Sequence, residues 1–432
     1  MAHVAGGRAQ RAAVALFRGL ARLYIAIHRP KIVVVAGSVG KTSTKLMLAQ
    51  FLSSEKRVSY MDDSYNSGVG LYLSVFEKKV PNRTTPGAWL GVLIKVIGHF
   101  FKHYEILLLE YGIDRPGEMD EMITFARPHC AILTAVTPEH MEFLHTIDIV
   151  GAEETKILRA CRDFGVVNSV DVDAKYLKDI SVQLYTYGSS NDIASYDIQS
   201  RTASGSTVTF SVDGQQYKPQ KTAVISDALI RQISGALLMA QKLGISRKAL
   251  EAAIQTVKPA ASRMHPLRGI HDSHLIDDTA NFSPVAGVVA LQTLKQITSA
   301  RHIAILGNMH ELGEFIEEGY QQVGEQFKGL DIIVLVGDMS VEHFGTIARA
   351  KGFKLDDNLF YFDSSTKAGI FVRDTIVKKD DAILIKGPFG GYYLEEATKK
   401  LLADNSDSQY LTRQSQFWLD KKQKQFGASL DQ

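Results

Sequence analysis

Residues 32–44 decide the fold, since they read IVVVAGSVGKTST. An apolar, strand-like run leads directly into a glycine loop, and a helical pattern follows over Ser43–Leu52. Such a loop turns its backbone N–H groups towards phosphate oxygens at the positive end of a helix. The sequence therefore predicts a nucleoside triphosphate site. Its predicted binding residues are Gly37, Ser38, Val39, Gly40, Lys41, Thr42 and Ser43.

Two side chains of this loop have a predicted chemical role. The Lys41 ammonium is expected to reach the outer phosphates, and the Thr42 hydroxyl suits a magnesium ion. Val35 stands where the common form of the loop places its first glycine, so this is the shorter G-x-x-G-K-T variant. A chance glycine turn is the alternative, but the strand before the loop and the helix after it supply the context that the motif requires.

Composition limits the class of protein. The chain has 432 residues, of which 45% are hydrophobic and 22% charged, and this describes two to three soluble domains. A formal charge of +2 gives no general attraction to nucleic acid, so none is expected as a partner. The two cysteines, Cys130 and Cys161, form no C-x-x-C pair and are expected to be ordinary buried thiols in a reducing cytoplasm.

The N-terminal segment needs its own interpretation. Residues Ala12–Ile27 are fairly apolar, but arginines interrupt the run, so it is unsuited to span a bilayer or to act as a signal peptide. We favour a helix that packs on the nucleotide domain over a helix that contacts a membrane or a partner protein. The same alternatives and the same preference apply to the apolar stretch Trp89–Phe101. The interrupting and flanking arginines are Arg8, Arg11, Arg18, Arg22 and Arg29.

Apolar runs alternate with helical patterns along the first half of the chain. The runs are Ile32–Ala36, Ile106–Glu110, Ala131–Thr134 and Phe164–Val167. This alternation predicts parallel strands with crossover helices. From about Ser189 to Tyr217 the pattern changes to period two, and the turn residues Asp213-Gly214 predict a β-hairpin.

A second α/β series follows the helical patterns Ala228–Leu243 and Arg247–Thr256, with a boundary near residues 258–265. Its strands are His302–Leu306, Ile332–Val336 and Ala382–Ile385. The predicted fold class is α/β, with a P-loop central domain of parallel strands plus a small β-hairpin region, then a Rossmann-like C-terminal domain. The predicted segments are an arginine-rich amphipathic helix (1–30), a central ATP-binding domain (31–258), a C-terminal domain (259–404) and a polar tail (405–432).

Several further motifs carry a family resemblance. They are LEYG at 109–112, PGEM at 116–119, TPEH at 137–140, DDTAN at 277–281, LGNMHELGE at 306–314 and IKG at 385–387. In this order the chain, from Ile32 to about Leu402, resembles the Mur ligase family, the ATP-dependent amide ligases of peptidoglycan precursor synthesis. It looks most like the branch that adds D-alanyl-D-alanine to a UDP-linked muramoyl tripeptide.

The chemistry of such a ligase explains the charged residues. Forming an amide from a carboxylate requires a better leaving group, which ATP supplies as an acyl phosphate that an amine then attacks. Both steps accumulate negative charge, so a lysine and Mg²⁺ ions are needed at the γ-phosphate. The resemblance assigns Glu110 and His140 to magnesium; a solvated acid at a strand end and an unremarkable loop histidine are the alternatives.

One departure from the family bears on the metal site. Counted from His140, the family's carbamylated lysine, which helps to hold a second magnesium, falls on Glu154, and the family's acid two positions later is Lys156 here. Glu154 could supply the carboxylate-like oxygen directly, as a catalytic and metal-binding residue. The alternative is that both are surface charges and the second metal site is weakened.

The resemblance also implies contacts outside the loop. Arg263 and Asp278 match nucleotide-binding residues, the second of them for the ribose, and Asn281 ends the same motif. For substrate, Asn66 resembles a loop beside the phosphates, or is turn chemistry, and Lys386 either steers the amine's carboxylate or caps a turn. Ala280 and Arg231-Gln232 replace the usual aromatic residue and His-Asn pair, so base recognition is expected to differ.

The largest departure concerns the UDP moiety. The related ligases carry an N-terminal domain of about a hundred residues for it, whereas about thirty residues precede the first strand here. A partner, the arginine-rich helix or a different substrate is expected to account for this. Two alternative functions stay open: a ligase of the folylpolyglutamate, polyglutamate or cyanophycin type, and a nucleotide-binding module without ligase activity.

Overall fold

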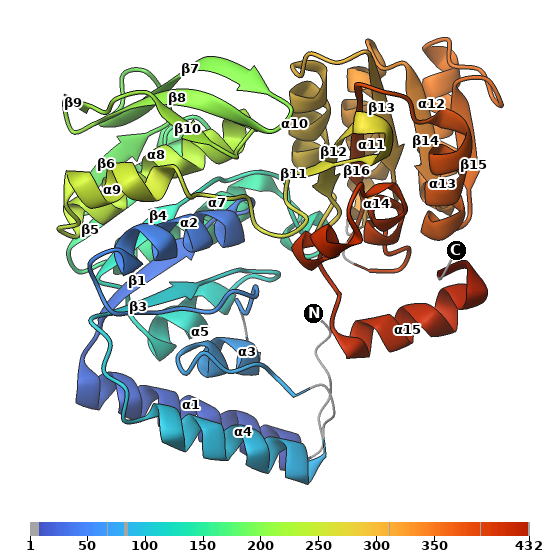
Figure 1. Ribbon diagram of the computed structural model, residues 1–432. Helices are drawn as coiled ribbons and strands as arrows, with labels where there is room; N and C mark the ends of the chain where they lie inside the picture. Colours follow the sequence, from blue (N-terminus) through green and yellow to red (C-terminus); the bar gives the residue numbers. More distant parts are fainter. Residues whose placement is uncertain (1–7, 67, 82–84, 311, 389, 431–432) are drawn as a thin grey trace.

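The computed structural model describes residues 8–66, 68–81, 85–310, 312–388 and 390–430. Two α/β domains lie side by side (Figure 1). Each apolar run predicted above is a strand, because a parallel strand covered by helices on both faces is apolar throughout. The fold-class prediction is therefore confirmed, as are the two buried cysteines.

The first domain is built on a sheet of ten strands, in the order β10-β8-β7-β6-β5-β4-β1-β3-β2 with β9 paired to β8. Pairing is parallel from β2 to β7 and antiparallel among β7, β8, β9 and β10. The predicted hairpin is thus an extension of the central sheet. The strands are β1 (Lys31–Ala36), β2 (Val58–Ser59), β3 (Ile106–Glu110), β4 (Cys130–Leu133), β5 (Phe164–Asn168), β6 (Gln183–Tyr187), β7 (Ala194–Thr202), β8 (Gly205–Val212), β9 (Gln215–Gln216) and β10 (Gln220–Thr222).

Helices cover both faces of this sheet, and alternate residues of each strand enter different cores. Val33 and Val35 of β1 pack in one cluster with α2, α8 and α9, whereas Ile32 and Val34 pack in another with α1, α3, α4, α5 and α7. The helices are α1 (Arg8–His28), α2 (Lys41–Ser53), α3 (Gly68–Ser74), α4 (Pro86–His99), α5 (Glu118–Phe125), α6 (Met141–Leu144), α7 (Ile147–Ala160), α8 (Asp227–Lys242) and α9 (Arg247–Ile254), with η1 (Ala174–Leu177).

The second domain has a six-stranded sheet in the order β11-β12-β16-β13-β14-β15, parallel except for the β11–β12 pair. One apolar cluster continues from the first domain into this one, through Met264 and Phe282. The strands are β11 (His265–Arg268), β12 (His274–Asp278), β13 (Arg301–Leu306), β14 (Ile332–Val336), β15 (Leu359–Phe362) and β16 (Asp381–Lys386).

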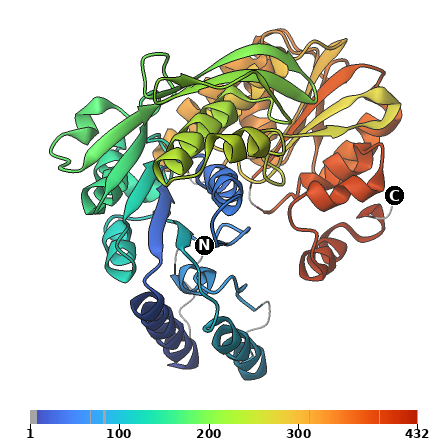
Figure 2. The ribbon, with the colours of Figure 1, turned by 60° about the vertical axis from the view of Figure 1, so that its left-hand side comes forward.

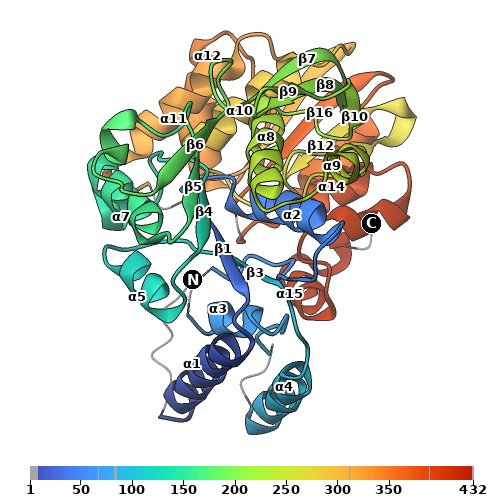
Figure 3. The same ribbon diagram turned by 90° about the vertical axis from the view of Figure 1, so that its left-hand side faces the viewer.

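Helices flank the second sheet as well (Figure 3). The α-helices are α10 (Pro284–Lys295), α11 (Ile316–Gly324), α12 (Gly345–Ala350), α13 (Ser365–Phe371), α14 (Glu395–Leu401) and α15 (Gln416–Phe426). The short 3₁₀ and π segments are η2 (Ile270–Asp272), η3 (Gly313–Phe315), η4 (Glu325–Phe327), η5 (Ser340–Phe344), η6 (Val372–Ile376), η7 (Asn405–Tyr410) and η8 (Gly427–Leu430).

The N-terminal helix packs on the first domain through one face only. Phe17, Ala21 and Tyr24 of α1 are buried, and the Tyr24 hydroxyl donates to the Lys102 carbonyl at 2.9 Å. The expected packing on the nucleotide domain is therefore seen. In the described part of the chain, no helix is long and apolar enough to cross a bilayer.

The polar tail is folded and packs against the second domain. Two of its basic side chains form buried ion pairs with glutamates of α14. Lys422 Nζ lies 2.9 Å from Glu395 and 2.6 Å from Glu396, and Arg413 donates to both oxygens of Glu395. The polar composition of the tail gave no indication of these buried ion pairs. The domain limits of the sequence analysis stay predictions, but residues 405–430 pack against the second domain.

Loss of Lys422 would leave two buried carboxylates short of a cation. We expect Lys422→Met to lower the free energy of unfolding by about 3–5 kcal/mol, measured by urea unfolding, because breaking a buried ion pair leaves uncompensated charge. The neighbouring exposed Lys421→Met is the control, with an expected change within about 0.5 kcal/mol. Equal effects in the two variants would contradict a structural role for the network.

Candidate active site

The phosphate-binding loop has the backbone that its glycines allow. Gly37 has φ 124° and Gly40 has φ 86°, both in the left-handed region. A Cβ at Gly40 would lie 2.0 Å from the Gln232 side-chain nitrogen, and one at Gly37 would lie 2.4 Å from the Thr134 hydroxyl. Neither position can carry a side chain without displacing a neighbour.

Lys41 begins α2 and is enclosed by the loop. Its ammonium donates to the carbonyls of Gly37 at 2.6 Å and Ser38 at 2.7 Å, and lies 3.7 Å from a Glu139 oxygen. Burial alone would lower the pKa of Lys41, but Glu139, Glu154 and other carboxylates raise it above its ordinary value. The side chain is therefore a fixed positive charge at the mouth of the loop.

Glu110 ends β3 and accepts hydrogen bonds from the hydroxyls of Thr42 at 3.0 Å and Ser64 at 2.8 Å. Its other oxygen pairs with the buried Lys45 at 2.9 Å. Burial would raise the pKa of Glu110, yet Lys45, the Ser64 hydroxyl and Lys41 lower it below its ordinary value. Thr42 and Glu110, each predicted separately as a magnesium ligand, are in direct contact, and both carry oxygen atoms of the kind that Mg²⁺ prefers.

Glu154 lies on α7 with 1% of its surface exposed, so it is not a surface charge. One carboxylate oxygen accepts a hydrogen bond from the Gly37 N–H at 2.9 Å, so Glu154 is in direct contact with the backbone of the phosphate loop. Burial raises the pKa of Glu154 to about 7, while Lys41 opposes the shift and Glu139 adds to it. Lys156 lies further out and pairs with Asp120 and Glu153.

His140 precedes α6 with φ 52°, and its Nε2 lies 3.4 Å from Asp114. It influences the pKa of Glu154, so the two groups share one electrostatic environment. No three acidic, histidine or cysteine side chains of the described residues come together as a ready metal cluster. The predicted metal ligands are therefore near one another but not assembled, because Lys45 holds Glu110 and the Gly37 N–H holds Glu154.

In the second domain, two of the predicted ligand residues bind each other. Lys386 is 1% exposed, and its ammonium lies 2.6 Å from Asp278 and 3.0 Å from the Asn281 carbonyl. Asp278 also accepts the Met264 N–H at 3.1 Å. The predicted roles of Asp278 with ribose and of Lys386 with substrate stay predictions, and in this structure the two side chains are largely buried and paired with each other.

The remaining predicted residues lie at the facing edges of the two domains. Arg263 acts electrostatically on Lys41, so the linker lies close to the phosphate loop. Segment η3 of the second domain packs closely against α6, next to His140. A Cβ placed on Gly313 of η3 would lie 3.2 Å from the Cα of Glu142 in α6. Asn281 is exposed, and its side chain accepts the Phe282 N–H.

Asn66 lies against the end of β3. The Gly112 N–H donates to its carbonyl at 3.3 Å, and a Cβ on Gly112 would meet the Asn66 amide at 2.4 Å. This close approach explains why a glycine follows Glu110-Tyr111. Residues 67, 311 and 389 lie outside the described residues, so Glu311 of the LGNMHELGE motif is not placed.

Three residues contact the phosphate loop or Glu110 in a way that the sequence analysis did not predict. Lys45 follows Lys41 by one helical turn, so the 3.6-residue period could have found it. Thr134 donates to the Val39 carbonyl at 2.6 Å and supports the loop, and Gln232 lies against Gly40. These two are contacts between distant segments, which no local pattern reveals.

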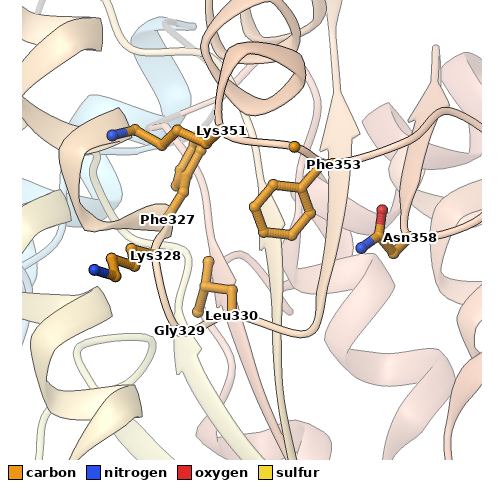
Figure 4. A pocket seen from close by; sticks show the side chains of 8 residues that line it. Phe327, Lys328, Gly329, Leu330, Lys351, Phe353 and Asn358 are labelled. Atoms are coloured by element: carbon orange, nitrogen blue, oxygen red, sulfur yellow. The ribbon is translucent and has the colours of Figure 1, made fainter.

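The second domain also has a pocket of about 430 Å³, lined by Phe327, Lys328, Leu330, Phe353 and others (Figure 4). It lies where η4 joins β14 and where α12 joins β15. None of the predicted catalytic or nucleotide-binding residues lines it. The candidate site is therefore at the phosphate loop and not in this pocket.

Comparison with known proteins identifies the family. Residues 35–240 match the Mur ligase middle domain, and residues 262–389 match the Mur ligase, glutamate ligase domain. The chain belongs to the Mur ligase family. The resemblance carried by the sequence motifs is confirmed, and with it the class of enzyme, an ATP-dependent ligase that forms amide bonds.

Relatives of this Mur ligase include the UDP-N-acetylmuramoyl-tripeptide--D-alanyl-D-alanine ligases of Bacillus subtilis and Escherichia coli. The first is 22% identical over 89% of this chain and 78% of its own length. The second is 24% identical over 72% of this chain and 65% of its own length.

Two solved structures show the same fold. MurF ligase from Thermotoga maritima, in complex with ADP, has a TM-score of 0.73 at 20% identity, over 90% of this chain and 83% of its own. Folylpolyglutamate synthase from the same organism has a TM-score of 0.58 at 16% identity, over 90% of this chain and 96% of its own.

The raised pKa of Glu154 has a consequence for stability. The folded state binds this proton more tightly than the unfolded chain, so its stabilising effect is full below the ordinary glutamate pKa and is lost as pH rises through about 7. We expect Glu154→Gln, which keeps an acceptor for the Gly37 N–H, to gain thermal stability over the wild type between about pH 5 and about pH 8.

Melting in the presence of a chelator, monitored by circular dichroism, measures this difference. Glu153→Gln, which removes the adjacent partner of Lys156, is the matched control and should show no gain that grows with pH. A constant difference between Glu154→Gln and the wild type across the range would refute the expectation.

Proposed function

We propose that this Mur ligase adds D-alanyl-D-alanine to a UDP-linked muramoyl tripeptide, with ATP and Mg²⁺. Lys41, fixed among carboxylates at the carboxyl end of β1, is the observation that carries the proposal. The named relatives in Bacillus subtilis and Escherichia coli support this choice of substrates. We further propose that the protein acts in the cytoplasm on small molecules, without nucleic acid.

The phosphate loop fits a nucleoside triphosphate. The first turn of α2 presents backbone N–H groups that have no partner within the helix, and Lys41 adds a positive charge beside them. ATP supplies the phosphoryl group that activates the substrate carboxylate. Lys41 stabilises the negative charge that develops on the transferred group, while Thr42 and Glu110 provide oxygen ligands for magnesium.

Glu154 takes the place of the family's carbamylated lysine in our proposal. Its carboxylate is buried beside Lys41 and under Gly37, so it can present a negative oxygen towards a second magnesium without carbon dioxide. His140 is proposed as the neighbouring ligand. In the second domain Arg263, Asp278 and Asn281 are proposed for the nucleotide, and Asn66 and Lys386 for substrate.

A folylpolyglutamate-type ligase is the second candidate. The folylpolyglutamate synthase structure shares the fold of this chain, with a TM-score of 0.58. The higher TM-score and the named relatives favour the MurF reaction. A monomeric amino acid would then replace the dipeptide as the amine.

Substrate-dependent phosphate release tests the reaction. We expect release from ATP with Mg²⁺ only when UDP-muramoyl-tripeptide and D-alanyl-D-alanine are both present, with the pentapeptide product detected by mass. Lys41→Ala should lower the rate by at least about a hundredfold, because the main charge on the transferred group is lost. Release with a folate or polyglutamate acceptor and glutamate instead would establish the second candidate, and no release with either would leave a binding module.

The role of Glu154 is tested by titrating magnesium. We expect Glu154→Gln to raise the magnesium concentration needed for half-maximal turnover about tenfold or more, because one anionic ligand is lost. Stabilisation against heat by Mg²⁺ with a non-hydrolysable ATP analogue should fall in parallel. Unchanged magnesium dependence in both measurements would show that Glu154 is only a structural support for Gly37.

A further inference from the structure

Helices α1 and α4 carry an unusual concentration of exposed apolar side chains. Twelve large apolar residues of the described part of the chain are exposed, and seven of them lie on these helices or within two residues of their ends. On α4 they recur at helical spacing, opposite the buried Val92 and Val96. The seven are Leu16, Leu23, Ile27, Leu90, Ile94, Ile97 and Phe101, with Phe101 83% exposed.

The two helices form one surface. Phe17 in the middle of α1 packs on Trp89 in the first turn of α4, at 5.6 Å between ring centroids. Further along both segments, Tyr24 packs on Phe100, directly after α4, at 5.7 Å. They therefore run in the same direction, side by side, at one end of the molecule (Figures 1 and 2). The chain passes from α1 directly into β1, whose opposite end leads to the phosphate loop, so this surface is separate from the candidate active site.

Charge is segregated onto the same two segments. Residues 1–31 and 78–104 together contain eleven lysines and arginines and no aspartate or glutamate. The rest of the chain has 38 basic against 47 acidic residues and is therefore net negative. The near-neutral total therefore conceals a basic excess in these two segments, although Lys31 and Lys79 pair with Asp163 and Asp63, and Glu77 and Glu105 flank the second segment. On the described surface, Arg22, Lys95 and Lys102 are exposed beside the apolar residues.

We propose that the α1/α4 surface binds an anionic phospholipid bilayer, with both helices lying in the interface. Apolar side chains at helical spacing can enter the acyl boundary, and basic side chains beside them can contact lipid phosphates. Neither helix could span the bilayer. A second copy of the chain fits less well, because it would bring two such basic surfaces together at a cost in repulsion.

Vesicle flotation tests the surface with the full chain. We expect the protein to float with vesicles that contain about one-third phosphatidylglycerol, and to bind pure phosphatidylcholine and high-salt samples far less. The double variant Ile94→Gln and Phe101→Gln should lower binding about tenfold, because two exposed apolar side chains no longer enter the bilayer. Its matched control is Val170→Gln with Leu355→Gln, two exposed apolar residues elsewhere, which should bind like the wild type.

A second pair of variants isolates charge. Lys95→Glu with Lys102→Glu should lower binding at least about tenfold, whereas Lys328→Glu with Lys354→Glu changes net charge equally on the second domain and should have little effect. Unchanged ATP turnover and melting temperature show that each variant is folded.

Three results would overturn the proposal. They are absence of flotation, equal binding to neutral vesicles, and equal losses in the control variants. A concentration-dependent dimer that the Ile94 and Phe101 variant abolishes would assign the surface to self-association instead.

Discussion

The largely enclosed Lys41 at the phosphate loop is the constraint on which the rest of the site depends. An ammonium removed from water costs several kcal/mol unless anions lie close to it. Lys41 meets this requirement through Glu139, Glu154 and Glu110, and Lys45 pairs with Glu110 one helical turn away. These lysines and carboxylates largely balance one another before any phosphate enters. A triphosphate adds further negative charge, which is the physical reason why divalent cations are needed there.

Strand order brings these groups together. Strands β3, β1 and β4 are neighbours and parallel, so their carboxyl ends meet at one edge of the sheet. Glu110 ends β3, the phosphate loop follows β1, and the Thr134 hydroxyl after β4 binds the Val39 carbonyl of that loop. Residues about a hundred positions apart thus converge because crossover connections return each strand in the same direction.

Sequence reasoning succeeded where a local pattern carries the information. Strands such as β14, which are buried on both faces, are unbroken apolar runs in the sequence. The glycines of the phosphate loop indicate a backbone with positive φ. It failed where the partner lies far along the chain. Glu154 is buried because α7 packs against the loop at Gly37. Lys422 of α15 is buried because it pairs with Glu396 of α14. In the sequence, neither residue can be told apart from a solvated surface charge.

The same limitation applies to net charge, which is an average over the whole chain. A value of +2 correctly describes the sum, yet it hides a basic excess in the two segments that contain α1 and α4. The rest of the chain is net negative, and the lysines of its candidate site are paired with carboxylates. Electrostatic attraction acts over about 10 Å or less at physiological salt, so a partner responds to the local surface and not to the sum. Lys95 and Lys102 face solvent beside Ile94 and Phe101. The ammonium groups of Lys41, Lys45 and Lys386, in contrast, each lie within 3.7 Å of a carboxylate oxygen. Some lysines of this chain are therefore available to an external partner, and others balance charge inside the candidate site. Burial and ion pairing decide between the two roles, and composition contains neither.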